Sequence, residues 1–287
     1  MLTHFQAHGL HFSDACWLGG RQNLHWAVRL RREPAVLRRW YADAPDTEYE
    51  LRVLEQVAAR GWPVPVPLSA ALFVSGACWS LFSFLPGAAP LREAMRERGR
   101  LLATFHAQTA GLGRFGRRPG WQPVLEVLSD PATEPLLEAS ERRLPAEVRA
   151  LRWHLHRART RLAQTMPPEP DGPGQLIHGD FTSWNLRVQD GRLSGLLDFE
   201  FARPEHRLAE FALAWRGQHD EVVLGYHDLA PLSDTEWALL TPYWWAHLIG
   251  SACQILARGE WDDGWTLQML LRRSPLMGED ASAYTGT

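Results

Sequence analysis

Three side chains with oxygen donors follow two apolar segments in the second half of the chain. Asp180 and Asn185 lie five residues apart, directly after an apolar run, and one loop can therefore present both to the same point. Asp198 stands at the end of a second apolar run, thirteen residues after Asn185. The turn residues Asp190-Gly191 predict that the two runs pair as neighbouring strands. We therefore expect Asp180, Asn185 and Asp198 to converge.

This combination of groups suits phosphoryl transfer from ATP. The reaction needs hard oxygen ligands that hold Mg²⁺ against the phosphates, and a carboxylate that orients the acceptor hydroxyl and takes its proton. We predict that Asp180 is the base and that Asn185 and Asp198 bind the metal. The alternative is an ordinary turn, in which an aspartate after glycine caps a backbone amide. The second carboxylate at the end of the next strand favours the phosphotransferase interpretation.

The N-terminal region has the pattern of a small mixed β and α unit. Two β-compatible runs surround a tight turn, a segment of helical periodicity follows, proline-rich chain forms a crossover, and two further strands precede Pro86-Gly87. These elements are expected, in chain order, at residues 24–30, 35–40, 47–61, 62–67, 72–74 and 79–85.

The remaining chain is predicted to be mainly helical. Helical periodicity covers 91–110 and 134–166 and resumes after His206, and the strand pair is expected at 175–188 and 193–199. The predicted fold class is therefore α+β, with one domain at 1–87 and a second at 88–287.

The sequence His178-Gly179-Asp180 with Asn185, followed by Asp198-Phe199-Glu200, resembles the aminoglycoside phosphotransferase and choline kinase superfamily. The resemblance implies a two-lobed protein-kinase-like fold, with a small β-rich nucleotide-binding lobe and a larger, mainly helical lobe that binds the acceptor. It also implies ATP and Mg²⁺ as cofactors and an alcohol group as acceptor. Glu200 is then either a third metal contact or, as we favour, a structural hydrogen-bond acceptor. Glu210 is expected to brace the segment that carries Asp180, and His178 to orient it.

The same resemblance assigns nucleotide contacts in the N-terminal region. Arg38 stands on the strand that carries the phosphate-contacting cation, and Glu50 on the helix whose glutamate pairs with it. Many relatives have lysine there, but this chain contains no lysine, so Arg38 or its neighbour Arg39 must serve. The other implied contacts are a nucleotide-covering loop with Gly19, Gly20 and Asn23, and an adenine-binding hinge at Ser83, Phe84 and Leu85.

The acceptor is less well defined by the sequence. The C-terminal region holds several tryptophans and acidic residues that could attract an aminated sugar or amino alcohol, but core packing and a solvated charged face are the ordinary roles of such residues. The residues concerned are Trp237, Trp244, Trp245, Trp261, Trp265, Asp220, Glu221, Asp228, Glu260, Asp262 and Asp263. A catalytically silent nucleotide-binding or partner-binding module on the same fold is the alternative function.

Charge and cysteine content exclude other classes. The formal charge is -3, without the basic footprint of a nucleic-acid-binding protein. Cys16, Cys78 and Cys253 are odd in number and far apart, which predicts reduced, buried thiols in a cytoplasmic protein. There is no apolar run of membrane-spanning length. The expected partner is a small hydroxyl-bearing molecule, and the sequence leaves the oligomeric state open.

Overall fold

The computed structural model describes residues 5, 11–20, 23–41, 44–90, 94–165, 175–282 and 284. The chain divides into two compact units. The first comprises Met1–Leu91, Phe115–Gly120 and Thr182–Ala202, and the second comprises Arg92–Arg114, Trp121–Phe181 and Arg203–Thr287. Asn185 and Asp198 therefore pack with the N-terminal elements, whereas Asp180 belongs to the second unit. The assignment of 1–87 and 88–287 to two functional domains stays a prediction.

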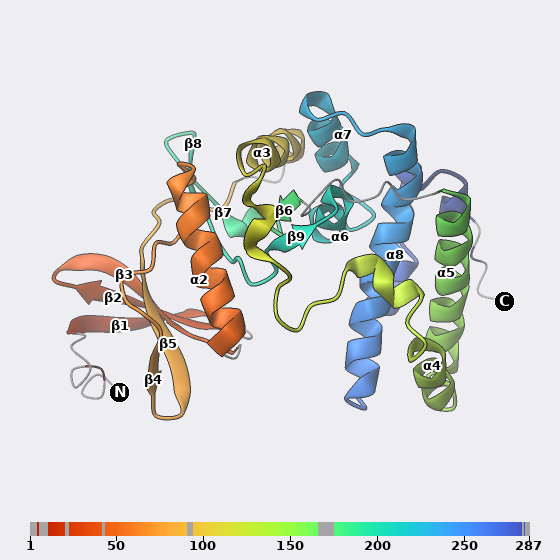
Figure 1. Cartoon of the computed structure of the whole chain (residues 1–287), viewed down its shortest axis with the longest axis horizontal. Coiled ribbons are helices and arrows are strands. Elements are labelled where there is room, and N and C mark those ends of the chain that lie inside the picture. Colours follow the sequence, from red (N-terminus) through yellow and green to blue (C-terminus); the bar gives the residue numbers. More distant parts are fainter. Residues whose placement is uncertain are drawn as a thin grey trace. The chain divides into compact units, whose positions relative to one another are not determined.

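A five-stranded antiparallel sheet forms the centre of the first unit (Figure 1), in the order β1-β2-β3-β5-β4. The strands are β1 (Phe12–Gly19), β2 (Leu24–Leu30), β3 (Glu33–Arg39), β4 (Leu72–Val74) and β5 (Ala77–Ser83). Strand β1 was not predicted, because it lies at the sheet edge and most of its side chains are exposed, so it lacks the alternation of a half-buried strand.

Alternation along β3 decides which side chains reach the functional face of the sheet. Ala35 and Leu37 are buried in an apolar cluster with Phe5, Phe12, Val28, Trp79 and Leu81. Arg38 is also buried, and it lies on the other face because successive side chains of a strand point to opposite sides. Arg39 is exposed. Of the two arginines between which the sequence could not decide, Arg38 is therefore the one that points inward.

Helix α2 (Ala44–Ala59) follows the β2–β3 hairpin and begins three residues before the predicted Thr47. Its residues Val53, Leu54 and Val57 are buried at helical spacing. This apolar stripe fixes the rotation of the helix, and Glu50, one turn before Leu54, is buried as well.

The predicted hairpin in the later chain is confirmed as β7 (Leu186–Gln189) and β8 (Arg192–Leu196). Its turn residues Asp190 and Gly191 have φ angles of 51° and 73°, as a type I′ turn requires. The expectation of one long strand over 175–188 is wrong. Strand β6 (Gln175–Ile177) ends before Gly179, which has φ 82°, and pairs with β9 (Arg203–Glu205) instead.

Helices make up most of the second unit. They are α3 (Met95–Gln108), α4 (Thr133–Glu141), α5 (Pro145–Gln164), α6 (Phe211–Ala214), α7 (Asp220–Leu229), α8 (Asp234–Ala257) and α9 (Trp265–Leu270). Helices α5 and α8 lie side by side in Figure 1 and share an extensive contact. The predicted α+β class, with a β-rich N-terminal part and a mainly helical C-terminal part, is confirmed.

Helices α3 and α7 approach each other closely at two glycines. A Cβ atom on Gly99 would lie 2.0 Å from the Val222 carbonyl oxygen, and one on Gly225 would lie 2.0 Å from the Arg96 carbonyl oxygen. Only glycine permits such an approach, so these residues set the distance between the two helices.

Several predicted burial states can be compared with the structure. Trp244 and Trp245 of α8 are buried, so core packing is confirmed for both. All three cysteines are free, but Cys16 is exposed on β1, so its predicted burial is wrong. Within the described part of the chain, no helix has the length and apolar character needed to span a membrane.

Candidate active site

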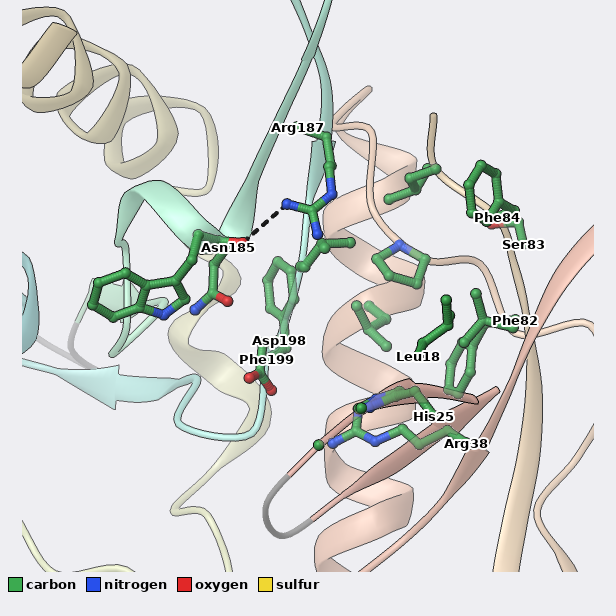
Figure 2. Close-up of a pocket in the computed structure, with 18 of the residues that line it drawn as sticks. Leu18, His25, Arg38, Phe82, Ser83, Phe84, Asn185, Arg187, Asp198 and Phe199 are labelled. Carbon is green, nitrogen blue, oxygen red and sulfur yellow. Dashed lines mark hydrogen bonds between the residues drawn. The ribbon is translucent and has the colours of Figure 1, made fainter. Parts of the chain in front are cut away.

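A cavity of about 460 Å³ lies within the first unit. Figure 2 shows Phe82, Ser83 and Phe84 on one side of this cavity and Asn185 and Asp198 on the other. Of the residues predicted to bind nucleotide or metal, those that line the cavity are Gly19, Gly20, Arg38, Glu50, Ser83, Phe84, Leu85, Asn185 and Asp198. The volume lies within the range of small-molecule sites.

The β7–β8 hairpin brings Asn185 and Asp198 together. Leu186 pairs with Leu196, and one step beyond this pair the Leu197 amide donates a 2.7 Å hydrogen bond to the Asn185 carbonyl oxygen. Asp198 then adopts φ 64°, a left-handed conformation that costs energy for residues other than glycine. The chain therefore turns away from the direction of β8 at Asp198, whose side chain lines the cavity.

Arg38 and Glu50 form a buried ion pair, with 2.6 Å between Nη1 and Oε1. The guanidinium also lies 3.9 Å from the centre of the Trp40 ring. Its Nε and Nη2 atoms have no hydrogen-bond partner among the residues that the structure describes. The pair expected from the family resemblance is therefore present, and Arg38 keeps donors for a further acceptor.

Arg118 does not line the cavity but supports residues that do, and the sequence did not reveal it. It comes from the segment 115–120, it is fully buried, and its Nε atom lies 2.6 Å from the Asp46 carboxylate. Its Nη1 atom donates to the carbonyl oxygens of Phe199 and Ala202, at 2.9 and 3.0 Å. Arg118 therefore ties the chain that follows Asp198 to helix α2. No motif marks it, because all of its partners are distant in sequence.

Two basic residues that were not predicted do line the cavity. Burial and the charge of Arg38 lower the pKa of His25 to about 4, so its imidazole is neutral at pH 7. Arg187 donates from Nη1 to the Trp184 carbonyl oxygen at 3.0 Å, as drawn in Figure 2. The strand pattern could have indicated both residues. His25 pairs with Arg38 across strands β2 and β3, and Arg187 stands two residues after Asn185, which is the spacing of side chains on one face of a strand.

Asn23 does not line the cavity. Its side-chain amide donates a 2.5 Å hydrogen bond to Glu200, and its side-chain oxygen accepts one from the Tyr41 amide. Burial and the neighbouring charge of Asp198 raise the pKa of Glu200 to about 7, although Arg38 opposes the shift. Glu200 thus accepts a structural hydrogen bond, as favoured from the sequence. Arg21 and Gln22, between Gly20 and Asn23, lie outside the described residues.

The predicted hinge is fastened to the hairpin that carries Asn185 and Asp198. Ala88 and Val188 exchange backbone hydrogen bonds of 3.1 and 2.8 Å, and the Ser194 hydroxyl donates to the Pro86 carbonyl oxygen. A Cβ atom on Gly87, which has φ 103°, would lie 2.6 Å from the Val188 carbonyl oxygen, so only glycine fits. These contacts hold two walls of the cavity in a fixed relation.

In the second unit, buried polar contacts hold the segment that carries Asp180. The Glu210 carboxylate accepts hydrogen bonds from the backbone amides of His178 and Gly179, at 2.7 and 2.9 Å. The Asp180 amide donates to His178 Nδ1 at 3.2 Å. The predicted bracing role of Glu210 and the orienting role of His178 are therefore confirmed. The Asp180 side chain is 11 % exposed.

The acidic residues considered as an attractant for a cationic acceptor are engaged with the protein itself. Glu221 and Asp228 pair with Arg96, and Asp228 pairs with Arg100 as well. Asp220 accepts hydrogen bonds from the Trp215 indole and the Ser274 hydroxyl. The charges of Glu221 and Asp228 are therefore offset by arginines, and the Asp220 carboxylate is held by neutral hydrogen-bond donors within the helical unit.

Comparisons by sequence and by structure both relate the chain to phosphotransferases. The profile of the phosphotransferase enzyme family matches residues 18–238. A homoserine kinase of Rhizobium etli is 30% identical over 244 residues, which cover 77% of this chain and 73% of that protein. A homoserine kinase of Gluconobacter oxydans is 27% identical, and the match covers 69% of this chain and 66% of that protein, about two thirds of its length.

Solved structures share the fold at low sequence identity. An apo form of a thermostable mutant of aminoglycoside phosphotransferase APH(4)-Ia superimposes with a TM-score of 0.72 at 17% identity, covering 99% of this chain and 100% of that one. The microcompartment-associated aminopropanol kinase superimposes with a TM-score of 0.63 at 15% identity, covering 97% of this chain and 94% of that one. These likenesses confirm the predicted protein-kinase-like fold. With the profile match over most of its length, the chain belongs to the phosphotransferase enzyme family, as its His178-Gly179-Asp180 and Asp198-Phe199-Glu200 motifs predicted.

Proposed function

We propose that the protein is an ATP- and Mg²⁺-dependent kinase that phosphorylates a hydroxyl group of a small amino alcohol. One observation carries the proposal: Arg38, Asn185 and Asp198 line the same cavity. A cation with donors to spare, a neutral amide oxygen and a carboxylate are the groups that a nucleoside triphosphate and its metal require.

The two sides of the cavity fit the two ends of ATP. The apolar side, with Phe82 and the backbone of Ser83 to Leu85, suits the adenine ring, which needs an apolar slot and backbone hydrogen bonds. Arg38 would donate from Nε and Nη2 to phosphate oxygens while Nη1 keeps its bond to Glu50. Structures of the APH(4)-Ia mutant include a ternary complex with ADP and hygromycin B, which supports a nucleotide in a fold of this kind.

The donor set fits magnesium. The Asn185 side chain offers an amide oxygen and Asp198 a carboxylate, and the hairpin holds both at the polar side of the cavity. Two such ligands leave coordination positions for phosphate oxygens and water, the arrangement that Mg²⁺ favours in nucleotide sites. When bound, the ion supplies charge neutralisation on the phosphates. The protein's own part is to keep Asn185 and Asp198 in position, which Arg118 supports through its bonds to the following loop.

Asp180 is proposed to orient the acceptor hydroxyl and accept its proton. A carboxylate in this role must be held rigidly, because positioning supplies much of the rate in phosphoryl transfer. Glu210 and His178 provide this rigidity through the backbone of residues 178–180.

The names of the relatives indicate the acceptor class. Homoserine and aminopropanol, the acceptors in the names of two of these proteins, are both small amino alcohols. We therefore propose an acceptor of this class for the present protein. A soluble enzyme of the cytoplasm, where ATP is available, fits this proposal.

Nucleotide consumption tests the proposal. Purified protein with Mg²⁺ and ATP should show turnover that depends on an added amino alcohol, measured as ADP released and as phosphorylated acceptor by mass spectrometry. Asp180→Asn should lose at least about a hundredfold in kcat while still binding ATP. Asp190→Asn is the matched control, because Asp190 is exposed and asparagine suits its type I′ turn. Near-normal turnover by Asp180→Asn would refute the base assignment, and ATP binding without turnover on any acceptor would favour the silent module.

A further inference from the structure

Two arginines of the second unit lie around Asp180 and have no part in the chemistry described so far. Arg216 follows helix α6, and its Nη2 atom lies 3.7 Å from Asp180 Oδ1, too far for a direct hydrogen bond. Arg98 belongs to α3, and its Nη2 atom donates to the carbonyl oxygen of Ala214 at 3.1 Å. The two side chains therefore reach the same region from different elements, Arg98 from helix α3 and Arg216 from the turn after α6.

A strained turn fixes the position of Arg216. Arg216 and Gly217 have φ angles of 56° and 63°, and a Cβ atom on Gly217 would lie 2.7 Å from the Met277 side chain and 2.9 Å from the Trp244 indole nitrogen. Arg272 donates to the Arg216 carbonyl oxygen at 2.8 Å. Strain of this kind in a rigidly packed turn is often associated with a functional residue.

Arg98 is more deeply buried than Arg216. It is 8% exposed, and its Nε atom has no hydrogen-bond partner within the described part of the chain. A buried guanidinium donor without an acceptor is costly, and native proteins seldom keep one without a reason. An added acceptor group at this point would satisfy it.

The charge of Arg216 makes this region electropositive. Burial and then the Arg216 charge lower the pKa of Arg98 to about 10, although Asp180 acts in the opposite direction. Burial lowers the pKa of His247 to about 4, with smaller contributions from Arg203 and Arg216. Asp180 carries one negative charge, and Arg216 alone is enough to balance it. Arg98 therefore adds a positive charge that Asp180 does not offset.

We propose that Arg98 and Arg216 form an anion-binding subsite beside Asp180, and that the phosphorylated acceptor carries a carboxylate or phosphate group near its hydroxyl. The inference rests on the proposed function and narrows its substrate class. The guanidinium groups would bind the anionic end of the acceptor and thereby hold its hydroxyl at the Asp180 carboxylate. A neutral or purely cationic alcohol would leave the buried donor of Arg98 unsatisfied.

A matched pair of acceptors tests the subsite. Homoserine and 3-aminopropan-1-ol differ only in the carboxylate, so the wild-type protein should show a kcat/KM for homoserine that is higher by about tenfold to a hundredfold. Glycerol 3-phosphate and glycerol form a second pair, in which a preference for the phosphorylated member would indicate that phosphate is the anion. The anion requirement is upheld if either pair shows the preference.

Variants then locate the subsite. Arg98→Gln should reduce the preference for the anionic acceptor to less than about threefold, and Arg98→Lys should restore part of it, because lysine keeps the charge but not the fork of donors. Arg100→Gln is the control, since Arg100 stands on the same helix but pairs with exposed carboxylates. It should keep the wild-type preference.

Several results would overturn the proposal. Equal use of the members of both pairs by the wild-type protein would do so, and that comparison does not depend on any variant folding. Equal losses on both acceptors in Arg98→Gln would show a purely structural role. Calorimetric binding of the members of both pairs, without nucleotide, separates this failure from that of the proposed function. Anion-selective binding in either pair without turnover would refute the kinase function alone, and unselective binding in both pairs would refute the subsite.

Discussion

The close contact of α3 and α7 predicts an unusual response to a small substitution. Alanine normally stabilises a helix interior relative to glycine by about 1 kcal/mol. In Gly99→Ala, however, the new methyl group would lie 2.0 Å from the Val222 carbonyl oxygen, 1.4 Å short of the distance at which ordinary contact begins. The obstructing atom is backbone, so no side chain can rotate away, and the helices must separate.

The magnitude follows from these two opposing effects. Overpacking of this kind costs about 3 kcal/mol, at the upper end of its usual range. After the gain of about 1 kcal/mol in helix propensity, we expect Gly99→Ala to lower the free energy of unfolding by about 2 kcal/mol. The matched control is Gly250→Ala in α8, where the nearest atom to the new methyl group is 3.8 Å away. This variant should gain about 0.5–1 kcal/mol.

Urea denaturation followed by tryptophan fluorescence and circular dichroism would measure both variants. The prediction is a pair of shifts with opposite signs, separated by about 3 kcal/mol at unchanged m-value. A Gly99→Ala protein as stable as Gly250→Ala would refute the reasoning, because it would mean that the helices do not approach as closely as described. Since α3 also carries Arg98, the variant should disturb the proposed anion subsite as well.

Three further predictions concern buried charges. Glu50→Gln removes the carboxylate shared by Arg38 and Arg118, so we expect the free energy of unfolding to fall by about 3 kcal/mol in urea denaturation; a loss under about 1 kcal/mol, as for an exposed pair, would contradict this. Arg118→Gln frees the loop after the proposed metal-binding aspartate, and the Mg²⁺ concentration for half-maximal turnover should rise about tenfold; unchanged Mg²⁺ dependence would remove its positioning role. Burial tends to raise the pKa of Glu236, but the hydrogen bonds from Arg207 and Ser233 and the charge of Arg207 together lower it to about 2 from 4.5. Because the folded pKa is the lower one, these contacts stabilise the protein above about pH 4.5, and about 3 kcal/mol of this stabilisation is lost as the pH falls to 2. Glu236→Gln should flatten this part of the pH–stability curve, and an unchanged curve would mean that another carboxylate causes it.

The sequence predicted those parts of the site that depend on local patterns. Asp190-Gly191 indicated the hairpin because a type I′ turn demands residues that accept positive φ, and the hairpin in turn placed Asn185 beside Asp198. Strand alternation allowed only one of Arg38 and Arg39 to point inward. In each case the information lies within a few residues of the position concerned.

Other parts of the site could not be predicted, because they depend on contacts between distant segments. Arg118 stands in a turn-rich stretch and acquires its role only when residues 46, 199 and 202 surround it. Arg98 and Arg216 are 118 positions apart, and neither belongs to a recognisable motif. A single sequence shows which residues are basic but not which of them share a buried region, so the cationic surroundings of Asp180 emerged only from the fold.

The arginine at position 38 also affects how this protein can be detected chemically. Acyl-phosphate derivatives of ATP label many kinases covalently by acylating the amine that lies beside the nucleotide phosphates. A guanidinium stays protonated and does not react in this way, and none of the 287 residues is a lysine. Such reagents would leave Arg38 unmodified even in a fully occupied site, so this kinase would escape surveys that identify ATP-binding proteins by labelled lysines.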